Sequence, residues 1–284
     1  MSESSTRGAA PPDAEALVAA AAKPRRFGAW YVAEHRFRVM RTYLQTMIAT
    51  GVGTPLIYLY AMGVGLATLV DQNLGDDAVD GIGYLAFVAP ALLCSAAMTI
   101  ASEEFSYPVF GGYKWNPIFT GMHAAPLRPQ QIVDGVVISV IVRILLSSVV
   151  YYLFMLLFGA VPGPAGALTI VAATLVGTAF GVPLMAYVST LRNDTGQLAS
   201  IMRFVVLPLT LFSGTFFPLS QMPVFLQWIG WISPLWHGTE LARVFAYGSP
   251  EPIWLTVTHV VVLVGCTLLG WALARRIAVG RLEK

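Results

Sequence analysis

Residues 144–191 read ILLSSVVYYLFMLLFGAVPGPAGALTIVAATLVGTAFGVPLMAYVSTL and contain no charged residue. An apolar helix needs about 20 residues to cross the hydrocarbon core of a bilayer, so this stretch is long enough for two such helices. The VPGP sequence at 161–164 interrupts it, and prolines next to a glycine are typical of a break between helices. The stretch and the residues just before it therefore predict two consecutive membrane-spanning helices, at 131–158 and 166–190.

The composition of the whole chain indicates the same class. Hydrophobic residues make up 56% of the 284 residues, charged residues only 11%, and the mean hydropathy is +0.69. Soluble domains carry about 25% charged residues, so a soluble enzyme, a secreted disulfide scaffold and a disordered chain are excluded. Cys94 and Cys266 are the only cysteines and both lie in apolar runs, which excludes a cysteine-based zinc site.

We expect an all-α polytopic membrane protein with six transmembrane helices, because apolar stretches of sufficient length occur six times. Residues 1–22 are predicted to form a disordered cytosolic tail, and residues 23–284 a single transmembrane domain. The predicted spans are 44–69, 82–102, 131–158, 166–190, 197–217 and 253–274. An even number of spans places both termini on one side of the membrane.

The distribution of Lys and Arg indicates which side that is, because cytoplasmic segments are enriched in these cations. The N-terminal arm carries seven of them: Arg7, Lys23, Arg25, Arg26, Arg36, Arg38 and Arg41. The C-terminal tail adds Arg275, Arg276, Arg281 and Lys284. In the first loop on the opposite side every charged residue is acidic, namely Asp71, Asp76, Asp77 and Asp80. Both termini are therefore predicted to be cytoplasmic.

The segment 23–43, before the first span, predicts an amphipathic helix that lies in the membrane interface. Aromatic and apolar residues alternate there with Arg36, Arg38 and Arg41 in steps of three and four. The alternative is a basic flank that only sets the topology.

The cytosolic stretch 103–130 is rich in aromatic residues and poor in charge. Proline and glycine bracket a short helix, predicted at 117–125. Exposed apolar side chains in a cytosolic loop indicate a docking surface, and the alternative is a loop that folds back on the membrane. Glu103 and Glu104, at the cytosolic end of the second span, are expected to meet cations of the lead-in segment or of a partner protein.

The outer stretch 219–247 is too apolar for an aqueous loop, and prolines interrupt it. It contains Trp228 and Trp231, and tryptophan prefers the membrane–water boundary. We expect a re-entrant or interface-lying helical hairpin, whose backbone must be covered by protein or line a cavity. Glu240 and Arg243 are three residues apart, on one helical face, and are predicted to mark the aqueous side of this hairpin.

Few charged side chains lie inside the predicted spans. Arg143 is the only charge deep in a span, and it either faces the bundle interior as a functional group or bonds to backbone carbonyls or a carboxylate. Asp134 is more than two helical turns away and is not an obvious partner. Ser213 and His259 suggest an intramembrane hydrolase dyad, although a serine in a span more often bonds its own backbone. The P-loop sequence G-x-x-x-x-G-K-[ST] does not occur, so the chain cannot bind ATP through one.

Several motifs together resemble one family. The sequence YPVFGGYKW at 107–115 is followed by APLRP at 125–129, and the outer stretch contains FPL at 217–219 and WISPL at 231–235. With six spans and a basic lead-in, these motifs resemble the ABC-2 type exporter permeases, and among them the branch of lipooligosaccharide (nodulation-factor) exporters. The resemblance covers nearly the whole chain beyond residue 25.

The resemblance implies the transport subunit of an ATP-driven exporter in the bacterial cytoplasmic membrane, with no catalytic residue, metal or cofactor of its own. ATP and Mg²⁺ would bind a separate subunit. The expected partners are two copies of a cytosolic ATPase, a second permease copy and the lipid bilayer, but not nucleic acid. The implied cargo is a lipid-linked saccharide or amphipathic molecule, and the alternative is drug or antibiotic efflux. Competing hypotheses from other classes are an intramembrane serine hydrolase and a channel.

The resemblance also implies which residues act. The lead-in helix and the segment 112–125, as a coupling helix, would rest on the ATPase through Arg36, Arg38, Arg41, Glu103, Glu104, Gly112, Trp115 and Phe119. The outer hairpin would cap the central path of a permease dimer as a gate that includes Pro218, Trp228, Trp231, Pro234 and Glu240. Arg143 is the candidate polar residue inside the membrane.

Overall fold

The computed structural model describes residues 13–74 and 81–283, and every regular element in these two ranges is helical. Asp76, Asp77 and Asp80 of the acidic loop and residues 1–12 of the expected tail lie outside the described residues. The α-helices are α1 (Ala14–Thr42), α2 (Leu44–Tyr60), α3 (Ala67–Leu74), α4 (Tyr84–Phe105), α5 (Tyr107–Tyr113), α6 (Ile118–Ala124), α7 (Pro129–Leu157), α8 (Thr169–Thr190), α9 (Gln197–Ile201), α10 (Leu207–Phe212), α11 (Val224–Ile232), α12 (Pro234–Tyr247) and α13 (Ile253–Leu282). Shorter π and 3₁₀ segments are η1 (Ala61–Leu66), η4 (Gly166–Leu168), η5 (Met202–Val206) and η6 (Leu219–Gln221).

Four helices in the described ranges are long and apolar enough to cross a membrane, so the chain is a polytopic membrane protein. They are Tyr84–Tyr113 (α4 with α5), Pro129–Leu157 (α7), Gly166–Thr190 (η4 with α8) and Ile253–Leu282 (α13), and they match four of the six predicted spans. The other two predicted spans each contain a π-helical segment. In the helical stretch 44–74 this segment is η1, and in the shorter apolar helix Gln197–Phe212 it is η5.

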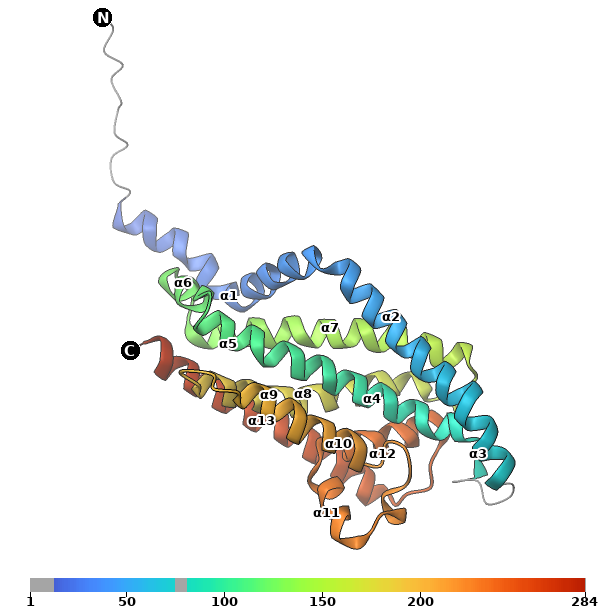
Figure 1. The fold of residues 1–284 in the computed structure, drawn as a ribbon. Coiled ribbons are helices and arrows are strands. Elements are labelled where there is room, and N and C mark those ends of the chain that lie inside the picture. Colours follow the sequence, from blue (N-terminus) through green and yellow to red (C-terminus); the bar gives the residue numbers. More distant parts are fainter. Residues whose placement is uncertain (1–12, 75–80, 284) are drawn as a thin grey trace, which may run out of the picture.

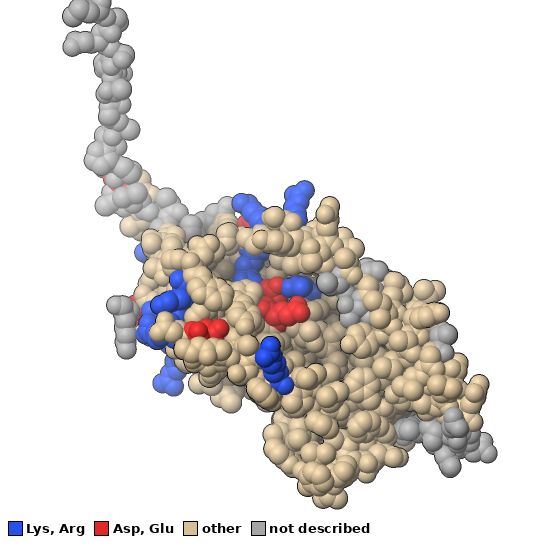
Figure 2. Space-filling model, in the orientation of Figure 1, with Lys and Arg blue, Asp and Glu red and all other residues tan. Residues whose placement is uncertain are grey.

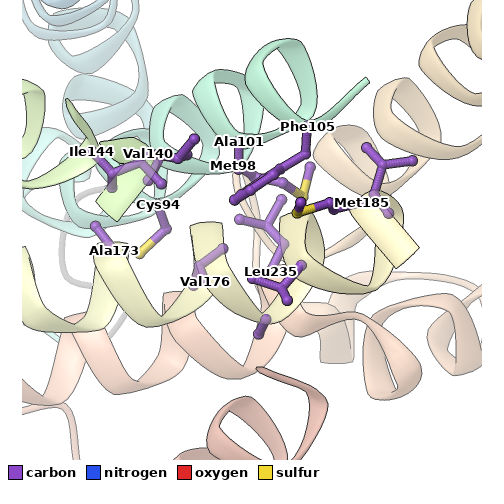
Figure 3. Close-up of a cluster of buried hydrophobic side chains, with 14 of the residues drawn as sticks. Cys94, Met98, Ala101, Phe105, Val140, Ile144, Ala173, Val176, Met185 and Leu235 are labelled. Carbon is purple, nitrogen blue, oxygen red and sulfur yellow. The ribbon is translucent and has the colours of Figure 1, made fainter. Parts of the chain in front are cut away.

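Helix α8 lies at the centre of the bundle, and α4, α7, α12 and α13 pack around it (Figure 1). Its side chains form one apolar core with those of its neighbours, part of which Figure 3 shows. In this core Met98 and Phe105 of α4 lie close to Met185 of α8. Lipid tails are as apolar as these side chains, so tight packing rather than the hydrophobic effect holds such helices together.

Glycines make this packing possible because they let helix backbones approach closely. A Cβ atom on Gly181 of α8 would lie 2.4 Å from the Phe105 ring, and one on Gly238 of α12 would lie 1.8 Å from Val176. On α13, a Cβ atom on Gly270 would lie 2.5 Å from the backbone nitrogen of Pro183. The contacts of α8 with α4, α12 and α13 therefore each depend on a residue without a side chain.

Helix α1 begins earlier than predicted. Residues 14–22, which were expected to belong to a disordered tail, are helical, because this alanine-rich stretch has high intrinsic helix propensity. The helix is broken at Phe27, whose backbone angles are not helical, and the part after the break lies against α7. There a Cβ atom on Gly135 of α7 would lie 2.5 Å from the carbonyl oxygen of Ala29.

The stretch 103–130, which was predicted to be cytosolic, is more helical than predicted. Helix α4 continues to Phe105, and α5 follows after a single non-helical residue, Ser106. After the Glu103-Glu104 pair the sequence is again mostly apolar, and Pro108 stands in the first turn of α5, where proline is tolerated. Helix α6 lies within the range predicted for the short helix, 117–125.

The outer stretch forms two helices of different character. Helix α11 is largely exposed, whereas α12 packs between α4, α8 and α13. The two helices meet at Ser233, whose hydroxyl oxygen accepts a hydrogen bond from the backbone N–H of Leu235 and so caps α12. The stretch therefore contains two helices, one of them buried, and their arrangement as a re-entrant or interface-lying hairpin stays a prediction.

The molecule has two distinct ends (Figure 1). The start of α1, helix α6 and the C-terminal end of α13 lie at one end, which we call the α6 end. Helices α3 and α11 lie toward the other, which we call the α11 end. Both described termini therefore lie at the same end of the bundle.

The contact between α8 and α13 is open to a matched test. We expect Gly270→Ala to lower the stability of the purified protein by about 1–3 kcal/mol, because the added methyl group forces two backbones apart. Gly265→Ala on the same helix is the control, since a Cβ atom there meets open space. Thermal unfolding in detergent measures both, and an equal unfolding temperature for the two variants would contradict the packing described.

Candidate functional site

Three charged side chains meet near the α6 end, one from each of three helices. The carboxylate of Glu104 on α4 accepts hydrogen bonds from two guanidinium groups. Arg36 of α1 donates to one carboxylate oxygen at 2.5 Å, and Arg143 of α7 donates to the other. The side chains of Glu104, Arg36 and Arg143 are 10%, 15% and 19% exposed, in that order. We call Arg36, Glu104 and Arg143 the charge triad.

The charge triad is held together by its electrostatics. Both oxygens of Glu104 are occupied by charge-assisted hydrogen bonds, which are about twice as strong as neutral ones. Burial lowers the pKa of the Arg36 guanidinium, and its attraction to the Glu104 carboxylate opposes that shift. Arginine stays protonated in proteins, so the triad carries a net positive charge that a further anion at this end would stabilise.

The charge triad also answers two expectations from the sequence. The expected contact between the Glu103-Glu104 pair and the lead-in segment exists between Glu104 and Arg36. Arg143 bonds to a carboxylate, as one of its two interpretations required, and that carboxylate comes from another helix. Asp134 instead accepts a hydrogen bond from Trp271 of α13 at 2.7 Å. Glu103 points outward and is exposed.

Two residues expected at the docking surface are buried instead. The Phe119 side chain is only 4% exposed and meets the Tyr113 ring edge-on, with ring centroids 4.8 Å apart. Gly112 is buried beneath it, where a Cβ atom would lie 2.6 Å from the Phe119 ring. Phe119 therefore fastens α6 to α5, and it has no surface to offer a partner.

The outer surface of the same region is formed by other residues. Trp115 is 62% exposed and stacks on Tyr107, with ring centroids 6.1 Å apart. Arg41 is exposed, and Arg38 is exposed while paired with Glu34 one helical turn away. We call Trp115, Arg38, Arg41 and Glu103 the exposed set. The predicted interface thus divides into an inner group that holds three helices together and an outer group that faces away from them.

Two cavities open beside these groups. One, of about 350 Å³, lies between α1 and the α5–α6 segment and is mostly apolar, with Arg36 and Glu104 among its lining residues. The other, of about 280 Å³, is lined by three cations from three segments, Lys114, Arg192 and Arg281, and by no acidic residue among those described. Figure 2 shows that the charged side chains on this face gather toward the α6 end, while the other described part of the same face is formed by uncharged residues.

The position of Arg281 links the second cavity to the helix core. Its guanidinium lies 4.0 Å from the centroid of the Tyr113 ring and donates a hydrogen bond to the carbonyl oxygen of Ser189 at 2.6 Å. The end of α13 is thereby tied both to α5 and to the end of α8.

At the α11 end the prediction for Arg243 was wrong. Its side chain is buried, not aqueous: the residue is 1% exposed. The guanidinium donates to the carbonyl oxygens of Gly214 and Phe87, pairs with Glu240 at 2.8 Å, and lies over the Phe87 ring. The sequence spacing correctly placed Arg243 beside Glu240. It could not show that α4 and the turn after α10 cover this face of α12 and bury the arginine.

The remaining hairpin residues lie where the sequence indicated an apolar surface. Trp228 and Trp231 of α11 are 54% and 53% exposed. Pro218 and Pro234 stand at the starts of η6 and α12, where a missing N–H costs nothing. The structure does not form the Ser213–His259 dyad, because Ser213 donates to Ser233 at 2.7 Å and His259 lies against His237.

Comparison with known proteins identifies the family. The sequence pattern of the ABC-2 type transporter family matches residues 31–247, which is more than half of the chain. The chain is a member of the ABC-2 type transporter family. The resemblance inferred from its motifs is confirmed.

Individual relatives of this ABC-2 permease are distant. Nodulation protein J of Rhizobium leguminosarum bv. viciae is 28% identical over 196 residues, which cover 69% of this chain and 73% of that protein. Inner membrane transport permease YadH of Escherichia coli K12 is 26% identical over 253 residues, which cover 87% of this chain and 93% of that protein. Nodulation protein J of Neorhizobium galegae is 25% identical over 198 residues, which cover 70% and 73%.

Family membership gives the biochemical class. The chain is a transport subunit without a catalytic domain, which rejects the hydrolase hypothesis. Permeases of this family work with ABC ATPase subunits and normally lack cofactors of their own. An inner membrane permease among the relatives agrees with a multi-pass membrane protein.

The charge triad makes a prediction about stability. Removing the charge of Glu104 by Glu104→Gln leaves two arginines close together, and breaking a fully buried ion pair costs about 3–5 kcal/mol. We expect a smaller but clear loss here, since both arginines keep some exposure. The exposed neighbour provides the control, and Glu103→Gln should leave the thermal unfolding temperature unchanged. Equal unfolding temperatures would mean that the triad does not hold α1, α4 and α7 together.

Proposed function

We propose that this ABC-2 permease exports an amphipathic molecule, with a lipid-linked saccharide as the favoured class, across the cytoplasmic membrane of a bacterium. Two copies of a cytosolic ABC ATPase would drive it. The observation that carries the proposal is the exposed set at the α6 end, which lies outside a charge triad that joins three helices. The similarity to proteins named Nodulation protein J supports the cargo class.

The proposed topology has six spans with both termini in the cytosol. The four long helices supply four of them, and α2–η1–α3 and α9–η5–α10 supply the other two. The α6 end would face the cytosol, because the cations of the N-terminal arm and of the α13 end gather there. Charged side chains are costly in lipid, which favours this orientation.

The proposed coupling runs from the exposed set inward. Trp115 rests on the ATPase, and Tyr107 and Phe110 of α5 contact the Trp115 ring. Movement of this ring is passed to α5 and from there to α4. Helix α6 moves with α5, because Phe119 fastens the two helices together. The charge triad then carries the movement from α4 to α1 and α7, since Glu104 is bonded to both. The basic cavity of Lys114, Arg192 and Arg281 offers a place for an acidic side chain of the ATPase.

A second permease copy completes the proposed transporter. The segments α2, η5 and α11 present large exposed apolar side chains, among them Ile57, Phe204 and Phe225, which are 70%, 75% and 72% exposed. A bilayer covers some of these faces and the partner copy the rest. The hairpin of η6, α11 and α12 would then lie near the dimer axis and close the exit path.

The first test replaces the exposed tryptophan. We expect Trp115→Asp to weaken binding of the ATPase and to uncouple its ATP hydrolysis from export, because a charge replaces the apolar contact. Co-purification of the ATPase and export from proteoliposomes loaded with a fluorescent glycolipid or an amphipathic dye measure the two effects and separate the two cargo classes.

Two controls accompany this test. Trp115→Phe keeps an aromatic surface and should retain most export. Phe119→Asp buries a charge between α5 and α6, so it should lower the unfolding temperature, whereas Trp115→Asp should not. Normal export and normal ATPase binding by Trp115→Asp would reject the proposed docking surface.

A second test concerns the hairpin. Single cysteines are introduced into a chain that lacks Cys94 and Cys266, and a water-soluble thiol reagent is applied from outside. We expect slow labelling at Phe225→Cys and Trp228→Cys, which lipid or the second copy covers, and fast labelling at Pro250→Cys in the exposed connection before α13. Equally fast labelling at all three positions would describe an ordinary aqueous loop and not a gate.

A further inference from the structure

A buried polar cluster lies at the α11 end, where α11, α12 and α13 meet. The imidazole rings of His237 and His259 are almost completely buried, with 6% and 0% exposure, and their Nδ1 atoms are 2.7 Å apart. The Nε2 atom of His237 lies 3.0 Å from the carbonyl oxygen of Trp231. The Nε2 atom of His259 lies 3.4 Å from the carboxylate of Glu251. The Trp236 ring lies edge-on to both imidazoles.

The hydrogen-bonding groups of this cluster form a row, and the number of protons that the row needs can be counted. The row has three links: Trp231 carbonyl to His237, His237 to His259, and His259 to Glu251. A carbonyl and a carboxylate only accept, and each link needs one proton between its two atoms. Two neutral imidazoles supply two protons. The row is therefore complete only when it holds one proton more than two neutral histidines and an ionised carboxylate provide.

The third link is the one that the structure leaves open. The Nε2 atom of His259 is buried and has no hydrogen-bond partner. If it is unprotonated, a lone pair faces a carboxylate away from water, and a buried acceptor without a donor is costly. A proton shared between His259 and Glu251 removes this cost. Thr256 donates a hydrogen bond to the other oxygen of Glu251 and so holds the carboxylate in place.

A metal ion does not fit the same atoms. Nitrogen ligands lie about 2.0–2.1 Å from Zn²⁺, so two of them on a tetrahedral ion are well over 3 Å apart. The Nδ1 atoms are closer than that, at a distance typical of a shared proton. Among the described residues no group of three His, Cys, Asp or Glu side chains has the geometry of a metal site.

We propose that Glu251, His259 and His237 form a proton-binding site that fastens the outer hairpin to α13. With its third proton the row is continuous from the start of α13 through α12 to the last turn of α11. Without it the link at Glu251 becomes repulsive and the fastening weakens. This inference concerns how the hairpin is held, and it stands whether or not the hairpin gates a transport path.

Other charged groups around the site do not supply the proton. On α12, Glu240 and Arg243 are paired with each other, and Arg243 is bonded further to Phe87 and Gly214. Helix α11 contributes the Trp231 carbonyl and no charged residue, and α8 carries no charged residue either. Helix α13 contributes no other charged residue in its first four turns.

The sign of the pH dependence follows from the count. In water, the unperturbed pKa values of glutamic acid and histidine are about 4.3 and 6.5, so the separated groups hold about half an extra proton at pH 7 and almost none above about pH 8. In this range the fastened state, with its one extra proton, holds more than the separated state. Between about pH 7 and 9, lowering the pH therefore stabilises the fastened hairpin and raising it weakens the hairpin, whereas below about pH 6.5 the separated histidines bind more protons and the sign reverses.

The test uses a variant that supplies the missing donor permanently. In Glu251→Gln the amide NH₂ group donates to His259 and the amide oxygen still accepts from Thr256, so all three links are complete without an extra proton. We measure thermal unfolding of the full chain in lipid nanodiscs between about pH 7 and 9, above the range in which separated histidines titrate. The wild-type unfolding temperature should fall by several degrees toward pH 9, and that of Glu251→Gln should stay nearly constant and exceed the wild-type value at high pH.

The controls make each outcome decisive. His35→Gln, on the exposed side of α1, should keep the wild-type pH dependence, which excludes a general effect of losing a histidine. The ¹⁵N spectrum of histidine-labelled protein should show a protonated Nε2 on His259 as well as on His237 at about pH 7. The same pH dependence in wild type and Glu251→Gln, or a Glu251→Gln protein less stable than wild type at pH 9, would overturn the proposal.

Discussion

A charge inside a lipid-embedded helix bundle has to find its partner within the protein, because the hydrocarbon around it offers none. This constraint shapes both ends of the molecule. Near the α6 end, Glu104 is bonded to arginines from two other helices, and near the α11 end Arg243 is held by Glu240 and by two backbone carbonyls. Each of these groups joins elements that are far apart in sequence. The polar side chains thus determine which helices stay together, while the apolar core between them supplies close contact.

The division between buried and exposed residues at the α6 end separates two tasks. The charge triad and the Phe119–Gly112 contact give α1, α4, α5, α6 and α7 a common, rigid arrangement. In the proposed coupling the exposed face of Trp115 contacts the ATPase, while the rings of Tyr107 and Phe110 pack against its indole. A rigid base below an exposed aromatic side chain is what a force-transmitting contact requires, since a flexible one would absorb the movement.

The apolar pattern of the sequence predicted most of the helices, and it failed where a partner from elsewhere in the fold decides. In the long uncharged stretch 144–191, α7 ends and α8 begins on the two sides of the VPGP break, as predicted. The break and the span length are local properties of the sequence. The partner of Arg143 was not predictable, since Glu104 reaches it only after α4 and α7 pack side by side. Arg243 looked like a surface cation for the same reason. His237 and His259 are 22 residues apart on different helices, and no spacing rule connects them.

Helix α13 reaches both ends of the bundle. His259 lies near its start, in contact with the hairpin, and Arg281 near its end lies over the Tyr113 ring beside the α5–α6 segment. At about 1.5 Å per residue these two positions are about 33 Å apart along one unbroken helix. An unbroken helix behaves as a stiff rod, so a tilt of about 10° around its middle moves both ends by about 3 Å in opposite directions. A movement of α13 at one end of the bundle therefore produces an opposite movement of the same helix at the other end.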